Sequence, residues 1–209
     1  IASILRETGA KVLVTLRAFP KTDVAQKAAA AVALAPGVTT VLEVDLNRYL
    51  TPPKSWIVPL IRPKNPVTHK ARVLNFRVEL ARQPTTLGFA DSTGDRVAAL
   101  FHTGGTTGMP KVAQHRYSGM VYNGWSGATL IFEAKDVLIC PLPLFHVLAA
   151  YPVLMSAIAS GAHVVFPTPA GYRGEGVFDN FWKLIERWRV VTAGLPDRRA
   201  PAHRHAPLL

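Results

Sequence analysis

A run of nine residues, 103–111, concentrates side chains that could hold a phosphate group, with the sequence TGGTTGMPK. Glycine has no Cβ, so main-chain N–H groups at such positions can approach an anion closely. The threonine hydroxyls add hydrogen-bond donors, and the lysine adds a positive charge on a long stem. The candidate nucleotide-binding residues are therefore Thr103, Gly104, Gly105, Thr106, Thr107, Gly108 and Lys111.

Two alternatives for this run are distinguished by spacing. A Walker A loop requires glycine directly before the lysine and a helix directly after it, but here Pro110 precedes Lys111 and Val112 continues into strand-like sequence. This difference excludes a Walker A loop. The other alternative is a plain turn between strands, but hairpin turns usually need only about two to five residues. We therefore favour a phosphate-binding loop over a plain turn.

A second candidate cluster, PLPLFHV at residues 141–147, follows the lysine by about 35 residues. It lies between an expected strand and an expected helix, and open α/β sheets bind ligands at the carboxyl ends of their strands. An imidazole can donate or accept a hydrogen bond, so His146 could contact a carboxylate. The alternative is that His146 only caps the following helix. The other histidines near these clusters, His102, His115 and His163, are expected to be structural.

Both clusters resemble signature motifs of the adenylate-forming superfamily, which includes acyl-CoA synthetases, luciferases and peptide-synthetase adenylation domains. HTGGTTGMPK is similar to its phosphate loop, with His102 in place of an aromatic residue and Gly104 in place of a serine. PLFHVLA is similar to its motif P-L-F-H-x-x-G, with Ala149 in place of the glycine. The first change removes one hydroxyl from the phosphate cradle, and the second would narrow an acyl pocket. Within the superfamily, the chain most resembles acyl-CoA synthetases and fatty-acid–CoA ligases.

The resemblance implies an acid–thiol ligase that uses ATP, Mg²⁺ and coenzyme A. A carboxylic acid would attack the α-phosphate of ATP, and the coenzyme A thiol would then displace AMP. Residues 103–108 would hold the β- and γ-phosphates, and Lys111 would offset their charge. His146 would be the catalytic residue beside the carboxylate, with Phe145, His146 and Ala149 in the substrate pocket and no residue assigned as a metal ligand. Fatty, aromatic and short-chain acids all remain open.

The elements that must position these residues alternate between strands and helices. Such alternation predicts an α/β fold, and the resemblance implies layered α-β-α subdomains with mostly parallel sheets, forming part of the large domain of an adenylate-forming enzyme. Glycines 119, 124 and 127 predict close packing of one helix against a neighbour. The expected strands are 11–15, 38–44, 97–101, 112–113, 136–141, 163–166 and 189–193, and the expected helices are 1–8, 22–34, 70–81, 117–132, 147–160 and 176–187.

We divide the chain into four segments. Residues 1–95 are expected to be the end of a first α/β subdomain, including a connection with six prolines, and 96–117 a phosphate-binding strand-loop-strand. Residues 118–196 would begin a second subdomain. The sequence of residues 197–209, rich in Arg, Pro, Ala and His, has no periodicity, and we hypothesise that the reading frame changes near Pro196.

Composition and charge restrict the kinds of molecule that the chain could bind and where it could be located. The net charge of +11 comes from scattered basic residues with no run of five, which argues against nucleic acid and agrees with anionic substrates. The single cysteine, Cys140, excludes an intramolecular disulfide and favours a reducing, cytoplasmic location. The longest apolar window, 147–159, is too short for a transmembrane span.

The resemblance also implies that several family features lie outside these 209 residues. They are the later acidic motif, the ribose-binding aspartate, the hinge and the small domain with its adenylation lysine. We therefore expect that the chain alone does not complete the reaction. Two alternatives remain open: a non-catalytic nucleotide-binding relic or scaffold module, and a phosphotransferase that uses the loop as a simple cradle.

Overall fold

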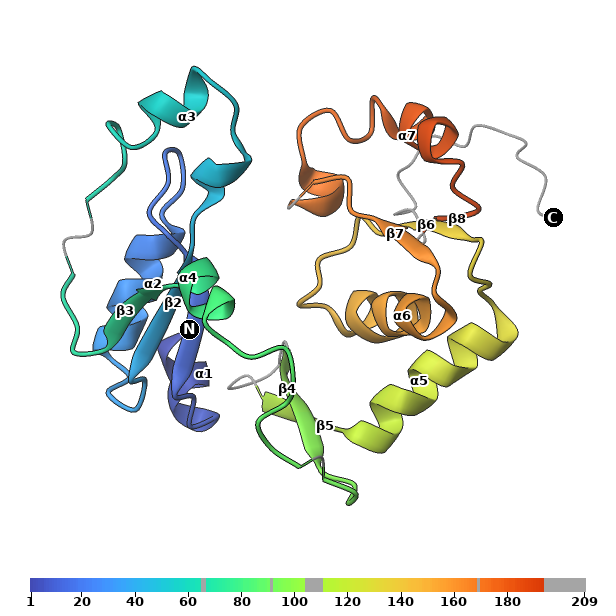
Figure 1. Cartoon of the computed structure of the whole chain (residues 1–209), viewed down its shortest axis with the longest axis horizontal. Coiled ribbons are helices and arrows are strands. Elements are labelled where there is room, and N and C mark those ends of the chain that lie inside the picture. Colours follow the sequence, from blue (N-terminus) through green and yellow to red (C-terminus); the bar gives the residue numbers. More distant parts are fainter. Residues whose placement is uncertain (65–66, 91, 104–110, 169, 194–209) are drawn as a thin grey trace. The chain divides into compact units, whose positions relative to one another are not determined.

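The computed structural model describes residues 1–64, 67–90, 92–103, 111–168 and 170–193. The chain forms two compact units, Ile1–Ser92 and Thr93–Leu209, and each contains its own three-stranded parallel sheet (Figure 1). Residues 197–209, for which the sequence showed no periodicity, lie outside the described residues. The α/β fold with mostly parallel sheets that the sequence predicted is confirmed.

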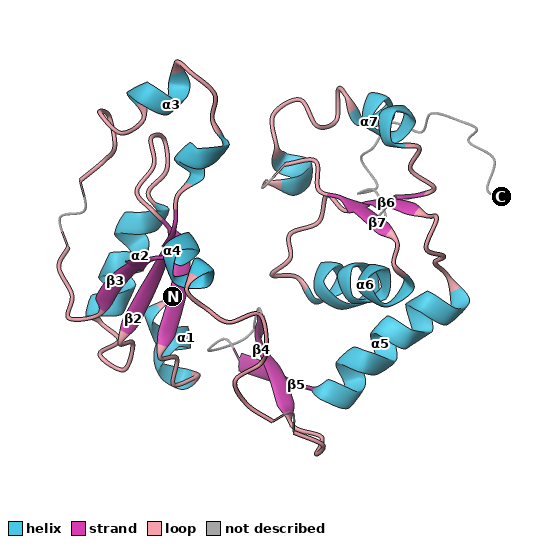
Figure 2. Ribbon diagram, in the orientation of Figure 1, coloured by secondary structure: helices cyan, strands magenta, loops and turns pink. Residues whose placement is uncertain are grey.

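The sheet of the first unit is built from β1 (Val12–Leu16), β2 (Thr40–Val44) and β3 (Arg72–Asn75), in that order (Figure 2). All pairings are parallel, with Leu42 opposite both Val14 and Leu74. The helix α2 (Val24–Ala33) connects β1 to β2, so the helix expected over 22–34 and the strands expected over 11–15 and 38–44 are confirmed and form a βαβ unit. Because the strands are parallel, the carboxyl ends of β2 and β3 lie at the same edge of the sheet.

The core of the first unit lies between this sheet and the helices α1 (Ala2–Glu7) and α2. The buried face of α2 consists mainly of alanines. Such small side chains let a helix approach a sheet closely. Gly9, with φ of +63°, ends the segment after α1. The buried cluster consists of Leu5, Ala31, Val32, Ala35, Val38 and Val41.

The helix predicted over residues 70–81 is wrong in its first half, because β3 occupies Arg72–Asn75 and only α4 (Phe76–Ala81) is helical. Asn75 marks the change, since its side-chain oxygen accepts hydrogen bonds from the N–H groups of Arg77 and Val78 at 3.0 and 3.1 Å. This is an N-cap, which starts a helix at the following residue. Between β2 and β3 lie two short helices, η1 (Leu46–Tyr49) and α3 (Lys54–Ile57).

The second unit begins with an antiparallel pair, β4 (Val97–Thr103) and β5 (Lys111–Arg116), followed by the helix α5 (Tyr117–Leu130). Its parallel sheet has the order β7 (His163–Val165), β6 (Val137–Ile139) and β8 (Thr192–Ala193). Leu138 and Ile139 on the central strand are buried. The predicted strands are confirmed, although β5 is longer than expected and β6 and β8 are shorter.

The helix predicted over residues 147–160 is replaced by a π-helix, η2 (Ala149–Met155), continued by α6 (Ser156–Ser160). Pro152 lies inside η2 and has no N–H to give to a helical bond. The wider turn of a π-helix is one way to accommodate such an interruption. Gly161 ends α6 in a left-handed conformation, with φ of +78°.

The helix predicted over residues 176–187 also begins later, as α7 (Phe181–Trp188). Gly176 has φ of +72°, a left-handed conformation that interrupts a helix, so the residues around it form turns. A short 3₁₀ helix, η3 (Gly171–Arg173), precedes them. Within the described ranges, no helix is both long and apolar enough to cross a membrane.

Candidate functional site

The two ends of the glycine- and threonine-rich run lie opposite each other in the β4–β5 pair. Thr103 is the last residue of β4 and pairs in register with Lys111, the first residue of β5. The lysine side chain is exposed. The remaining predicted phosphate-binding residues, Gly104, Gly105, Thr106, Thr107 and Gly108, lie outside the described residues.

The base of this hairpin is joined to the first turn of α5 by Asp95. Its carboxylate accepts hydrogen bonds from the Ser118 N–H at 3.1 Å and the Ser118 hydroxyl at 2.9 Å, and the Arg116 guanidinium lies 3.4 Å away. The bonds from Ser118 hold the pKa of Asp95 below its ordinary value. Because Arg116, at the N-cap, makes no capping bond, Asp95 supplies an acceptor that the helix start would otherwise lack.

Three aromatic rings connect the hairpin to η2. Phe101 on β4 and His115 on β5 have ring centroids 5.3 Å apart, and Tyr151 of η2 lies 5.4 and 5.0 Å from them. Tyr151 is 5% exposed, and burial raises the pKa of its hydroxyl. His115 thus packs in an aromatic cluster, which agrees with the structural role expected for it.

His146 starts the helical segment that follows β6. Its N–H donates to the carbonyl of Pro143 at 2.9 Å, and its Nδ1 accepts a hydrogen bond from the Leu148 N–H at 3.2 Å. The capping role that the sequence left open is therefore present. Because Nδ1 is an acceptor, a neutral ring carries its proton on Nε2. Nε2–H is the donor that His146 can offer to another group.

A cavity of about 450 Å³ lies beside His146, at the carboxyl ends of β6 and β7. Its lining is mainly apolar, and Phe145, 83% exposed, belongs to it. Ala149 is fully buried and is not part of the lining, and neither is His146. The lining residues are Leu142, Pro143, Leu144, Phe145, Phe166, Pro167, Thr168 and Gly171.

Gly171 closes the turn at one side of this cavity and was not singled out by sequence. It has φ of +60°, and a Cβ there would lie 2.1 Å from the carbonyl oxygen of Pro141. The same carbonyl accepts the N–H of Tyr172 at 2.9 Å, and the Thr168 hydroxyl donates to the Gly171 carbonyl at 3.1 Å. The Pro- and Gly-containing stretch 167–171 is the sequence signal that could have identified this turn.

Cys140 directly follows β6. It is 1% exposed, and burial raises the pKa of its thiol. Across the described ranges, no three His, Cys, Asp or Glu side chains gather into a set that could hold a metal ion.

Comparison with known proteins identifies the family. The sequence profile of the family described as AMP-binding enzyme matches residues 1–197. The chain belongs to the AMP-binding enzyme family. This match confirms the resemblance to adenylate-forming enzymes that the two motifs indicated.

Curated relatives of the chain are acid–CoA ligases. The marinolic acid–CoA ligase of Pseudoalteromonas sp. (strain SANK 73390) is 33% identical over 132 residues, covering 59% of this chain and 20% of that protein. The 4-coumarate:CoA ligase 1 of Petunia hybrida is 33% identical over 104 residues, covering 46% of this chain and 18% of that protein. The chain thus spans about a fifth of the length of these relatives.

Solved structures show the same fold. An anthranilate CoA ligase in complex with anthranoyl-AMP matches with a TM-score of 0.65 and 20% identity, over 92% of this chain and 32% of that one. MbtA of Mycobacterium smegmatis matches with a TM-score of 0.54 and 21% identity, over 93% of this chain and 31% of that one. At these identities, the likeness concerns the fold alone.

Proposed function

We propose that this chain carries the phosphate loop and the acid-binding motif of an ATP-dependent acid–CoA ligase. The observation that carries the proposal is the family match over residues 1–197, joined to relatives that are named as CoA ligases. In the first step, a carboxylate oxygen forms a bond to the α-phosphorus of ATP, and pyrophosphate leaves. In the second, the coenzyme A sulfur bonds to the acyl carbon, and AMP leaves.

In the proposed first step, the protein positions the reactants and offsets charge. Lys111 starts β5 directly after the glycine- and threonine-rich run. Its ammonium group would therefore lie beside the phosphates of a nucleotide held by that run and offset their charge. The β4–β5 pairing opposite Thr103 would fix where the run begins and ends. Mg²⁺ would enter as the complex with ATP, supplying further positive charge to the phosphate oxygens.

For the acid, we assign the cavity beside Phe145 to the carbon chain or ring and the Nε2–H of His146 to the carboxylate. The bond from Leu148 to Nδ1 supports this assignment, because it leaves the donor on Nε2. The apolar lining favours a fatty or aromatic acid over a short polar one. A cytoplasmic location, where coenzyme A and ATP are present, is part of the same proposal.

Calorimetric titration of Mg-ATP tests the loop. We expect binding by the native chain, binding at least roughly tenfold weaker in Lys111→Ala, because a charge-assisted phosphate contact is lost, and loss in Gly105→Val. Lys135→Ala is the matched control, since this exposed lysine of the same unit already pairs with Glu133 at 2.7 Å. No binding, or equal binding by all four proteins, would contradict the proposed phosphate site and favour a relic.

Hydroxylamine trapping of acyl-adenylate with a panel of carboxylic acids tests turnover. The chain spans about a fifth of its relatives' length, so we propose that it binds nucleotide without completing the reaction by itself. Hydroxamate or acyl-CoA formation by the 209-residue chain would refute this inactivity. Where acyl-adenylate does form, His146→Asn separates the capping role of the histidine from its role as a donor to the carboxylate. Asparagine retains a capping acceptor but not the Nε2–H donor.

A further inference from the structure

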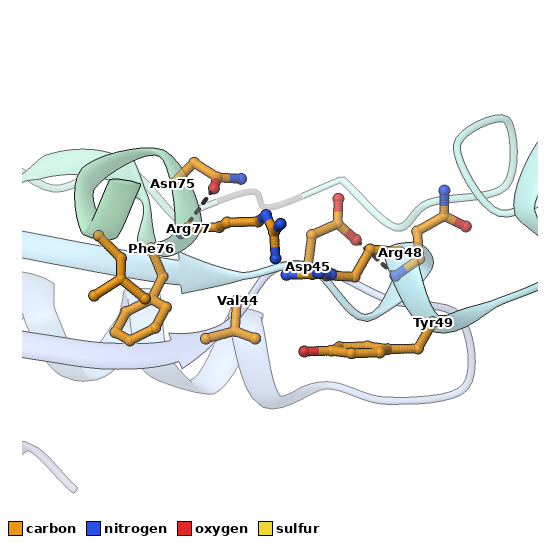
Figure 3. Close-up of a pocket in the computed structure, with 9 residues that line it drawn as sticks. Val44, Asp45, Arg48, Tyr49, Asn75, Phe76 and Arg77 are labelled. Carbon is orange, nitrogen blue, oxygen red and sulfur yellow. Dashed lines mark hydrogen bonds between the residues drawn. The ribbon is translucent and has the colours of Figure 1, made fainter. Parts of the chain in front are cut away.

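A second cavity, of about 480 Å³, lies in the first unit at the carboxyl ends of β2 and β3. Figure 3 shows side chains from the end of β2, from η1 and from α4 around it. This position is typical of ligand sites in open parallel sheets, and the volume falls within the range of small-molecule pockets. The lining residues are Val44, Asp45, Asn47, Arg48, Tyr49, Asn75, Phe76, Arg77 and Leu80.

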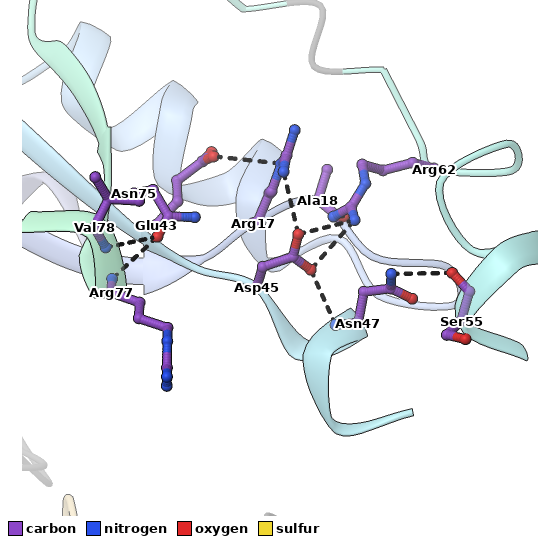
Figure 4. A network of polar contacts seen from close by, with 10 residues as sticks. All are labelled: Arg17, Ala18, Glu43, Asp45, Asn47, Ser55, Arg62, Asn75, Arg77 and Val78. Atoms are coloured by element: carbon purple, nitrogen blue, oxygen red, sulfur yellow. Dashed lines mark hydrogen bonds and ion pairs between the residues drawn. The ribbon is translucent and has the colours of Figure 1, made fainter. Parts of the chain in front are cut away.

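The carboxylate in this lining, Asp45, is already paired with the guanidinium groups of two arginines. Arg62 donates to both of its oxygens, at 3.2 and 3.1 Å, and Arg17 donates to one of them at 3.1 Å (Figure 4). The N–H of Asn47 adds a further bond at 2.9 Å. Glu43, 3.9 Å from Arg17, is the second carboxylate of this network. Two arginines and two carboxylates therefore balance one another here.

The two arginines of the pocket lining, Arg48 and Arg77, are not paired with a carboxylate of the described residues. In the described part of the chain, no carboxylate oxygen lies within 4.0 Å of the side chain of Arg48 or Arg77. Arg48 instead lies over the ring of Tyr49, with its guanidinium carbon 5.0 Å from the ring centroid. The pocket thus holds two positive charges in excess of the balanced network.

We propose that this pocket binds a small ligand through a phosphomonoester group. A guanidinium presents paired N–H donors in a plane that fits phosphate oxygens, and two of them can neutralise a dianion. The Tyr49 ring and the apolar side chains of Val44 and Phe76 offer surface for the rest of the ligand. The phosphomonoester could belong to the adenosine 3′-phosphate of coenzyme A or to a free nucleotide. All the lining residues belong to the first unit, whereas Lys111 belongs to the second.

Calorimetric titrations in a Lys111→Ala background, where the loop is disabled, test this site alone. The probes are inorganic phosphate, AMP, coenzyme A and dephospho-coenzyme A, which lacks the 3′-phosphate. The variants are Arg48→Ala, Arg77→Ala, the double variant and a control, Arg72→Ala. Arg72 is exposed at the amino end of β3, opposite the edge where the pocket lies, so it carries the same charge in the same unit without lining the pocket.

We expect a phosphomonoester probe to bind, each pocket variant to weaken binding by roughly tenfold or more, and Arg72→Ala to change it little. Binding should also weaken as salt rises, because the contact is ionic. Tighter binding of coenzyme A than of dephospho-coenzyme A identifies the 3′-phosphate as the source, and comparable binding of AMP identifies a free nucleotide. No binding of any probe, or equal loss in Arg72→Ala, overturns the proposal. So does unchanged affinity in a double variant with a native circular dichroism spectrum.

Discussion

The hydroxyl of Ser156, the first residue of α6, donates a hydrogen bond of 3.1 Å to the main-chain carbonyl of Asn123 in α5. Ser156 is 1% exposed, so this bond joins two helices where water does not reach. The approach is close because α5 has glycines on this face. A Cβ on Gly127 would lie 2.0 Å from the Ser156 oxygen and 2.2 Å from its Cβ. The predicted close packing is confirmed for Gly124 and Gly127.

Gly127→Ala should therefore destabilise the second unit, by about 1–3 kcal/mol, because the added methyl forces the helices apart. Gly119→Ala is the matched control in the same helix. No atom of the described residues lies within 4 Å of a Cβ there, so the close packing predicted for Gly119 is wrong. That change should raise stability by up to about 1 kcal/mol, since alanine favours helix. Urea unfolding followed by circular dichroism would measure both, and equal effects at the two glycines would contradict this account.

Gly171→Ala should disturb the cavity beside Phe145. The added Cβ cannot coexist with the Pro141 carbonyl at 2.1 Å, so the turn that binds Tyr172 and Thr168 must move. Gly176→Ala is the control for backbone strain alone, because its φ is also positive but its nearest neighbour is 3.4 Å away, at the Asn180 side chain. Binding of an acid with Mg-ATP should weaken by more in Gly171→Ala than in Gly176→Ala. Calorimetry would detect the difference, and the reverse order would oppose it.

Asp95→Asn should lower the melting temperature at neutral pH. The folded-state pKa of Asp95 lies below its ordinary value of 3.8, mainly because of the Ser118 hydrogen bonds. The ionised group therefore contributes stability above about pH 3.8, and this contribution is lost as pH falls through the folded-state pKa. The difference between native and variant melting temperatures should shrink below pH 4. A difference that grows on acidification would show that the charge is not responsible.

Arg62→Ala should destabilise the first unit by about 2 kcal/mol, because Asp45 loses two hydrogen bonds in a site where both side chains are mostly buried. Arg62 also donates to the Ala18 carbonyl at 2.6 Å. Arg17→Ala removes a bond to the same carboxylate from a side chain that is 47% exposed, so its cost should be about 1 kcal/mol or less. Hydrogen exchange of peptides from β1 to β3 would rank the two variants, and a larger effect of Arg17→Ala would refute the ranking.

The sequence predicted most of the fold because its pattern was locally strong. The apolar runs around β1, β2 and β6 and the alanine-rich α2 each favour one kind of element. The failures arose where a long-range contact decided the outcome. Residues of β3 lack a strong strand pattern and are extended because they pair with β2, while η2 widens around Pro152.

The site was predictable in its motifs but not in its surroundings. The spacing of Thr103 and Lys111 indicated a strand-loop-strand, and the structure pairs them in register. The cap at His146 was one of two open alternatives. The role of Gly171 depends on a carbonyl some thirty residues away in sequence, which no local pattern reveals. The pocket of Arg48 and Arg77 likewise forms only when two parallel strands end side by side.

The sulfur of Cys140 is the only thiol in the sequence, it is buried, and burial raises the pKa of this thiol. An alkylating reagent needs an accessible thiolate, so it must wait until the strand ends around β6 separate. The time course of labelling therefore records how often this sheet opens under native conditions. The unmodified protein therefore reports its own rate of opening through the rate of thiol labelling. A substitution that loosens the contact between Gly127 and Ser156 should increase this rate.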